Sequence, residues 1–149
     1  MKYSCFIIFY LLLTLSIQAL VVPVSDTPVL QDDNMLTNFV RNDPDDKKPE
    51  ENPTKVWLWQ QGNNLMIHFS CPIDSQFVVG PVEVRDEAMF SDYVSVQLIT
   101  LPYAYFAYYY TGYPNGNLVD GIRKEDMSVD LNWDSKYSYK TSYDDKNWE

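Results

Sequence analysis

From Lys55 onward the chain is a series of short runs rich in β-branched and aromatic residues, separated by turns of Gly, Pro, Asn and Asp. Runs of this length, in which apolar and polar residues alternate, are typical of half-buried β-strands. Neither an internal repeat nor a helical periodicity of useful length interrupts them. The sequence therefore predicts an all-β fold, an antiparallel β-sandwich of the jelly-roll kind.

The clearest pair of strands surrounds a turn that contains Gly and Asn. Residues 55–60 and 65–71 are two β-rich runs joined through residues 61–64, which predicts a β-hairpin. In the second run Leu65 and every second residue up to Cys71 share one face, which we expect to be the core. Because the only other cysteine, Cys5, lies in an N-terminal apolar run, no disulfide within the chain is expected.

Three further strands are predicted in the second half of the chain. Residues 93–100 alternate so that Val94, Val96 and Leu98 face inward, while the next run is densely aromatic and turns back at residues 114–117. A last strand is predicted at 136–143, which has Tyr on alternate positions. Few residues follow its Asp-rich turn, so we expect a sandwich that is incomplete at its C-terminal edge, with a C-terminal partner domain absent from this chain.

The N-terminus has the layout of a secretory signal peptide. A basic Lys2, an apolar run and a small residue at Ala19 follow one another, which predicts a signal peptide over 1–19. The apolar run is too short for a membrane span, so a retained anchor is the weaker alternative. Residues 20–53 are then a flexible or edge segment that enters the domain, and residues 54–149 form the sandwich, in a protein that is secreted, periplasmic or at the cell surface.

The net charge of −10 limits the classes of partner that the protein can bind. Nucleic acids and anionic membrane surfaces bind proteins through Lys and Arg, which release counterions. We therefore expect no nucleic-acid partner and no membrane insertion of the mature domain.

Several short signatures follow one another along the chain: Arg85-Asp86, Asp92 with Val94 and Val96, Phe106, Gly116 with Asp120, Trp133-Asp134, and Trp148-Glu149. Their order and spacing, from Leu36 to Glu149, resemble the family 9 carbohydrate-binding modules and the wider DOMON-like group of extracellular domains. The resemblance implies an exported, non-catalytic β-sandwich. Similar modules begin exported proteins of glycan metabolism or precede a large outer-membrane barrel.

The resemblance also implies where a sugar would bind. The family's shallow site clamps a sugar between two Trp side chains and adds acidic, basic and amide contacts, but the positions that match are Met89, Ser95 and Ala107, which lack that chemistry. Other aromatic side chains are therefore the candidate platform for a polysaccharide or other glycan, since sugar faces stack on rings. They are Trp57, Trp59, Tyr108 and Tyr110, and one of the two tryptophans is expected to face outward. The alternative is that these rings fill the core.

No metal or other cofactor is predicted, although a calcium site stays open. Asp86 and Asp92 are its weak candidates, because Ca²⁺ prefers several oxygen ligands. The alternatives are solvated loop carboxylates, or pairing of Arg85 with Asp92. Haem binding through Met66, His68 or Met89, as some DOMON-like proteins have it, also stays open. His68 is the only histidine and no Ser or Cys motif accompanies it, so no catalytic residue is predicted.

Two functional hypotheses follow from different classes. The first is an exported, non-catalytic carbohydrate-binding-like module that binds a glycan through exposed aromatic side chains. The alternative is a structural or interaction module without sugar binding, the N-terminal piece or truncated fragment of a larger cell-surface or outer-membrane protein.

Overall fold

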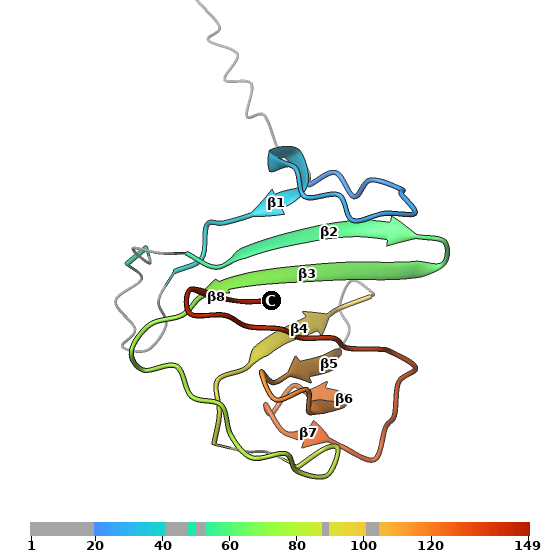
Figure 1. Ribbon diagram of the computed structural model, residues 1–149. Coiled ribbons are helices and arrows are strands. Elements are labelled where there is room, and N and C mark those ends of the chain that lie inside the picture. Colours follow the sequence, from blue (N-terminus) through green and yellow to red (C-terminus); the bar gives the residue numbers. More distant parts are fainter. Residues whose placement is uncertain (1–19, 41–47, 50–52, 88–89, 101–104) are drawn as a thin grey trace, which may run out of the picture.

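The computed structural model describes residues 20–40, 48–49, 53–87, 90–100 and 105–149. Within these residues it contains two antiparallel sheets of four strands each and, apart from one 3₁₀ turn at Asp32–Asn34, no helix (Figure 1). The predicted all-β, sandwich-like class is confirmed. The predicted signal peptide, 1–19, lies outside the described residues.

The first sheet has the strand order β1-β2-β3-β8. Its strands are β1 (Met35–Leu36), β2 (Lys55–Gln61), β3 (Asn64–Pro72) and β8 (Asn147–Trp148). The predicted hairpin is confirmed as β2 and β3, whose turn places Gly62 at φ +57°, a left-handed conformation that glycine adopts without strain.

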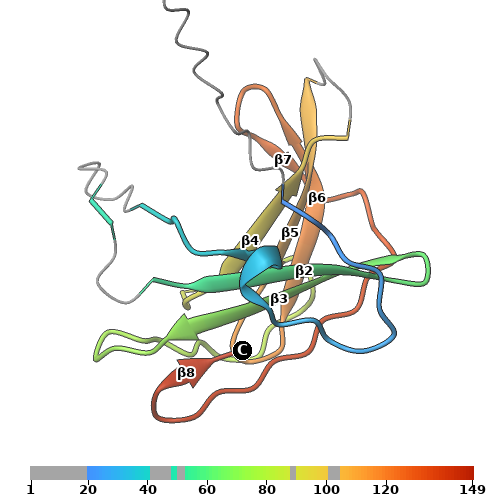
Figure 2. The same ribbon diagram turned by 90° about the horizontal axis from the view of Figure 1, so that it is seen from above.

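The second sheet is a meander of β4 (Val94–Leu98), β5 (Phe106–Gly112), β6 (Leu118–Lys124) and β7 (Val129–Asp130). Seen from above, its strands run across the direction of β2 and β3 (Figure 2). The predicted turn at residues 114–117 joins β5 to β6, with Gly116 at φ +89°. Residues 77–84, in the connection between β3 and β4, form no strand.

The N-terminal part of the described chain lies along the part of the β2 edge that β1 leaves unpaired. The Gln60 amide donates to the Pro23 carbonyl at 2.8 Å, and the Ser25 amide donates to the Gln60 carbonyl at 2.9 Å. The buried Asn34 side chain donates to the carbonyls of Val29 and Leu58, each at 2.9 Å. These bonds cover an edge that would otherwise expose unpaired backbone groups.

The two faces of the second sheet differ in what covers them. We call the face that carries Val94, Val96 and Leu98 the inner face, and the face that carries Ser95 and Gln97 the outer face; the alternation was predicted correctly. Val94 lines a cavity together with Cys71 of β3, so the inner face is the one turned to the first sheet.

The prediction of a strand at 136–143 is wrong. In that range only Tyr143 forms a bridge, to Trp148, and the rest of the segment is extended without a backbone ladder. Tyr137 and Tyr139 lie instead over the inner face, where the Tyr139 hydroxyl donates to the Tyr113 carbonyl at 3.1 Å. The ring of Tyr139 also packs where Gly112 has no side chain. The Tyr alternation thus reflects packing on a sheet rather than membership of one.

The last residues return to the first sheet through an Asp turn. One Asp144 carboxylate oxygen accepts the amides of Lys146 and Asn147 at 2.7 and 2.8 Å, and these bonds lower the pKa of Asp144. Asn147 and Trp148 then pair with Pro72 and Cys71 of β3. On the other side of β8, Ser142 and Glu149 exchange two backbone hydrogen bonds of 2.8 Å.

The pairing of β6 with β7 depends on a glycine. A Cβ atom at Gly121 would lie 2.6 Å from the Asp130 carbonyl oxygen, a backbone atom that cannot move without breaking the β6–β7 pair. We therefore expect Gly121→Ala to lower the free energy of unfolding by about 1–3 kcal/mol. Urea denaturation measures the loss, and Ser95→Ala, at an exposed position of β4, is the control. A Gly121→Ala variant as stable as the control would contradict this account of the contact.

Candidate functional site

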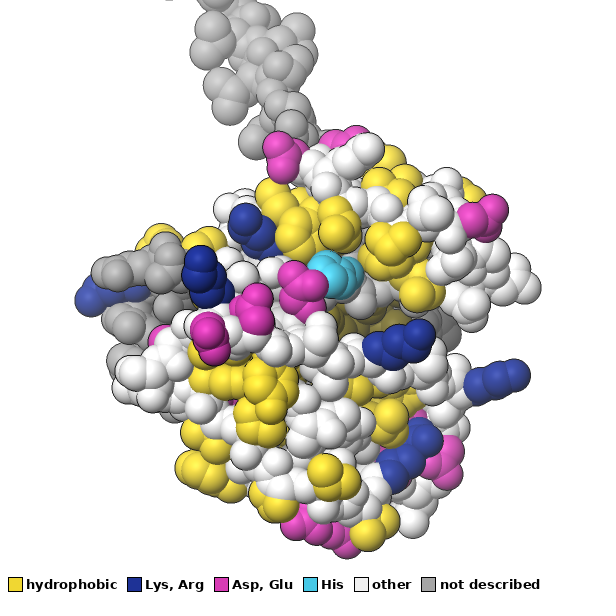
Figure 3. Space-filling model, in the orientation of Figure 1, with side chains coloured by type: hydrophobic (Ala, Val, Ile, Leu, Met, Phe, Trp, Pro, Cys, Tyr) yellow, Lys and Arg dark blue, Asp and Glu magenta, His cyan; other side chains and the backbone are white. Residues whose placement is uncertain are grey.

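The two tryptophans of the predicted platform lie on one face of β2. They are two residues apart, so strand alternation does not separate them as expected, and they face away from the second sheet. Trp59 is buried, with 5% of its surface exposed, whereas Trp57 is half-buried and packs against His68 with a ring separation of 5.5 Å. Hydrophobic side chains gather over this sheet on the face shown in Figure 3, beside the only histidine. Of the two indoles, only that of Trp57 is open to a ligand.

The two tyrosines of the predicted platform lie on the inner face. Their register partners in β4 are Leu98 for Tyr108 and Val96 for Tyr110. The Tyr108 ring lies 5.0 Å from the Trp133 ring, and the Tyr110 ring lies 5.1 Å from that of Tyr137. The structure therefore brings Tyr108 and Tyr110 together with each other and not with the tryptophans of β2, in an aromatic layer that packs the segment after β7 onto the sheet.

A shallow groove of about 200 Å³ lies at the end of the second sheet where β5 begins and β6 ends. Three of its apolar side chains are strongly exposed: Tyr105 by 75%, Ile99 by 67% and Met127 by 65%. The polar side chains of its lining include Gln97, Arg123 and Glu125. Tyr105 was not among the predicted site residues. The alternation of β4 could have identified it. Val96 and Leu98 face inward, so their register partners Tyr110 and Tyr108 do too. The alternate positions of β5, and Tyr105 just before it, are then on the outer face.

Arg123 is the one guanidinium at this groove. It is the register partner of Ala107, so its side chain lies on the outer face next to the position where the resemblance places a basic contact. Its Nη2 lies 3.6 Å from the sulfur of Met127, and its Nε has no acceptor among the described residues. No carboxylate of the described chain pairs with it. Within the described part of the chain its donors are therefore not committed to an ion pair.

The acidic residues gather elsewhere. Asp86, Asp120 and Asp134 each place a carboxylate oxygen within 4.8 Å of the others. Arg85 lies among them: its Nη2 is 2.5 Å from Asp120 and 3.9 Å from Asp134, and its Nε is 3.5 Å from Asp86. We call these four residues the Arg85 cluster. The expected pairing of Arg85 with Asp92 is wrong.

The other weak calcium candidate, Asp92, lies away from this cluster. Its carboxylate accepts the Val78 amide at 2.6 Å, in the loop between β3 and β4. Asp86 instead accepts the backbone amide of Asp120 at 3.0 Å. The structure therefore does not bring Asp86 and Asp92 together as ligands of one ion.

Burial sets the electrostatics of the Arg85 cluster. Asp120 is fully buried and also accepts the Ser135 amide at 2.5 Å. The hydrogen bond to Asp120 raises the pKa of Arg85, while burial, together with the nearby Asp120 charge, raises the pKa of Tyr137. The Tyr137 ring lies beneath the guanidinium, 5.8 Å from its central carbon. Arg85 occupies the space between the three carboxylates, and its single positive charge offsets part of their negative charge.

Comparisons with protein-family models, with curated proteins and with solved structures find no significant match for the chain. The resemblance to family 9 carbohydrate-binding modules therefore stays a prediction. Among the described residues, no helix is both long and apolar enough to cross a membrane.

The buried member of the Arg85 cluster should matter far more to stability than its exposed member. Asp120→Ala leaves the Ser135 amide without its acceptor and Arg85 without its closest partner, so we expect a loss of about 1–3 kcal/mol in the free energy of unfolding. Asp134→Ala is the matched control, because its side chain is 74% exposed and its ion pair is worth about 0–1 kcal/mol. Equal losses in urea denaturation would disprove the structural role of Asp120.

The same cluster predicts how the protein responds to calcium. Since the guanidinium already occupies the space between the carboxylates, we expect the thermal midpoint to be the same in excess Ca²⁺ and in excess EDTA. A site that binds Ca²⁺ only in the folded state would raise the midpoint in proportion to the logarithm of its concentration. Calorimetry in both buffers at matched ionic strength makes the comparison, and a rise specific to Ca²⁺ would contradict the prediction.

Proposed function

We propose that this protein is an exported, non-catalytic carbohydrate-binding-like module, and that its glycan site is the groove beside β5. The observation that carries the proposal is the combination at one shallow surface of an exposed tyrosine with uncommitted hydrogen-bonding side chains. Sugar rings present apolar faces that stack on aromatic rings, and their hydroxyls take directed bonds from guanidinium, amide and carboxylate groups.

The chemistry of the groove corresponds to what the family resemblance requires. The resemblance expects a basic residue at the position of Ala107. In this chain the basic side chain is that of Arg123, the register partner of Ala107 in the neighbouring strand. Gln97 offers an amide and Glu125 a carboxylate in the same lining. The groove is open and shallow rather than a deep cleft between two carboxylates, so it suits binding better than glycoside hydrolysis.

The tryptophan face of β2 is the less favourable place for a glycan. Trp59 is buried, and the half-buried Trp57 packs against His68, so two rings are not available to clamp a sugar. Tyr108 and Tyr110 are held by ring contacts with Trp133 and Tyr137. Tyr105, at 75% exposure, is the most exposed ring in the lining of the groove, beside Arg123, which has no ion pair with a described residue.

Affinity electrophoresis through a panel of soluble polysaccharides tests this proposal. We expect retardation by at least one polysaccharide, weakened about three- to ten-fold by Tyr105→Ala, the range that loss of one ring contact gives. Arg123→Met keeps the apolar stem and should weaken binding to a similar extent.

Phe90→Ala is the matched control, because Phe90 is 88% exposed and is not among the residues that line the groove. Equal weakening by Phe90→Ala would place the glycan elsewhere. If the folded protein is retarded by no polysaccharide and binds nothing on a glycan array, the proposal fails and the structural or interaction module becomes the better hypothesis.

A further inference from the structure

A second hollow lies where the two sheets meet, at the start of β4, whereas the groove lies at the end of β4. It has a volume of about 240 Å³ and is lined from the start of β2, the end of β3, the loop that follows, the start of β4, and β8. Its side chains include Trp148, of which 4% is exposed, and Tyr93, of which 59% is exposed. We call it the junction cavity, and it reaches from the buried interior to solvent.

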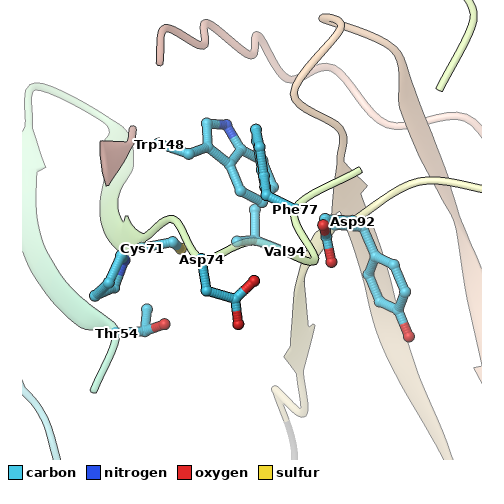
Figure 4. A pocket seen from close by; sticks show the side chains of 9 residues that line it. Thr54, Cys71, Asp74, Phe77, Asp92, Val94 and Trp148 are labelled. Carbon is cyan, nitrogen blue, oxygen red and sulfur yellow. The ribbon is translucent and has the colours of Figure 1, made fainter. Parts of the chain in front are cut away.

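The lining of the junction cavity combines carboxylates with aromatic rings. In Figure 4 the Asp74 carboxylate points away from Thr54, toward the side where Asp92 lies, while Phe77 and Trp148 lie together along another side. The centres of these two rings are 6.0 Å apart. No Lys, Arg or His is among the described residues that line the cavity.

The described residues supply no positive charge that pairs with the carboxylates of the cavity. Asp74 accepts the Gln76 amide at 2.7 Å and Asp92 accepts the Val78 amide at 2.6 Å, but neither forms an ion pair with a described residue. Burial, assisted by the Asp92 charge, raises the pKa of Cys71, so the thiol stays neutral. Two carboxylates therefore provide the charge of the lining, and no guanidinium of the described residues lies between them, in contrast to the Arg85 cluster.

From this lining we propose that the junction cavity binds a small organic ammonium ion. Carboxylates attract the positive head, and aromatic faces stabilise it by cation–π contact, the mode in which proteins recognise quaternary ammonium groups. A calcium ion fits less well, because it requires six to eight oxygen ligands and the cavity offers two carboxylates beside rings. The volume, below the roughly 300–1,000 Å³ of pockets for drug-sized ligands, limits the ligand to a small one.

The same charges argue for a free cation rather than a phospholipid headgroup. A phosphocholine carries a phosphate next to its ammonium group, and like charges placed together in an interface cost several kcal/mol. Asp74 and Asp92 would oppose that phosphate without a Lys or Arg in the lining to offset it.

Choline is a suitable probe, and its uncharged carbon isostere, 3,3-dimethylbutan-1-ol, is the matched control ligand. The backbone amides of Gln76 and Val78 and the indole N–H of Trp148 report on the cavity in ¹H–¹⁵N correlation spectra of the folded protein. At constant ionic strength we expect choline to shift these signals saturably. The isostere should bind about ten-fold more weakly, because it lacks the charge.

Variants make the test specific. Asp74→Asn keeps the oxygen that accepts the Gln76 amide but removes the charge, so we expect choline affinity to fall about five- to ten-fold. Asp126→Asn is the matched control: Asp126 likewise accepts the amide two residues on, from Ser128, but does not line the cavity. Phe77→Leu should also weaken choline binding.

Several results would overturn the proposal. They are the absence of saturable shifts with choline, equal affinity for the isostere, unchanged affinity in Asp74→Asn, and saturable binding of Ca²⁺ that displaces choline. Phosphocholine that binds as tightly as choline would overturn the assignment to a free cation. Because these signals come from the junction cavity and not from the groove, failure here leaves the glycan proposal unaffected, and the converse also holds.

Discussion

The rest of the structure depends on the buried carboxylate of Asp120. It lies on the inner face of β6, and its two oxygens take Arg85 from the loop before β4 and the Ser135 amide from the segment after β7. Its own amide is held by Asp86. Three parts of the chain that share no backbone ladder at this point are thus joined at one side chain. A carboxylate with no exposed surface persists only when it is paired and hydrogen-bonded in this way.

This interaction decides which aromatic side chains face solvent. Because Ser135 is held against β6, Trp133 and Tyr137 lie over Tyr108 and Tyr110 and cover the inner face. On the opposite face, near the start of β5, the described residues leave Tyr105 exposed. A dense aromatic strand thereby separates into a packed set and an exposed set, and only the exposed set is available to a ligand.

The sequence predicted the parts of the fold that depend on local pattern. The hairpin of β2 and β3 and the inward phase of Val94, Val96 and Leu98 follow from alternation and turn residues, and they are confirmed. The segment at 136–143 was mistaken for a strand because its alternating tyrosines have the period of one. What holds it, such as the bond of Ser135 to Asp120, joins residues far apart in sequence and leaves no periodic signal.

The candidate site was harder to predict for the same reason. The sequence predicts Tyr108 and Tyr110 as ligand-binding residues, but it does not give the register of β5 against β4. That register assigns both side chains to the inner face. Arg123 was not chosen, since nothing local distinguishes it from any other cation of the chain. Its importance comes from its cross-strand position opposite Ala107.

The two proposed sites differ because the few cations of the chain are distributed unevenly. The protein has 21 acidic and 11 basic residues, and the basic side chains of the described residues differ in how many carboxylates they contact. Arg85 is taken up by three of them, whereas Arg123 has none among the described residues, so its donors stay free for the neutral hydroxyls of a sugar. At the junction cavity the imbalance has the opposite sign, because Asp74 and Asp92 line a hollow to which the described residues contribute no cation. A cationic ligand is therefore the one that this cavity would bind at the lowest cost in desolvation.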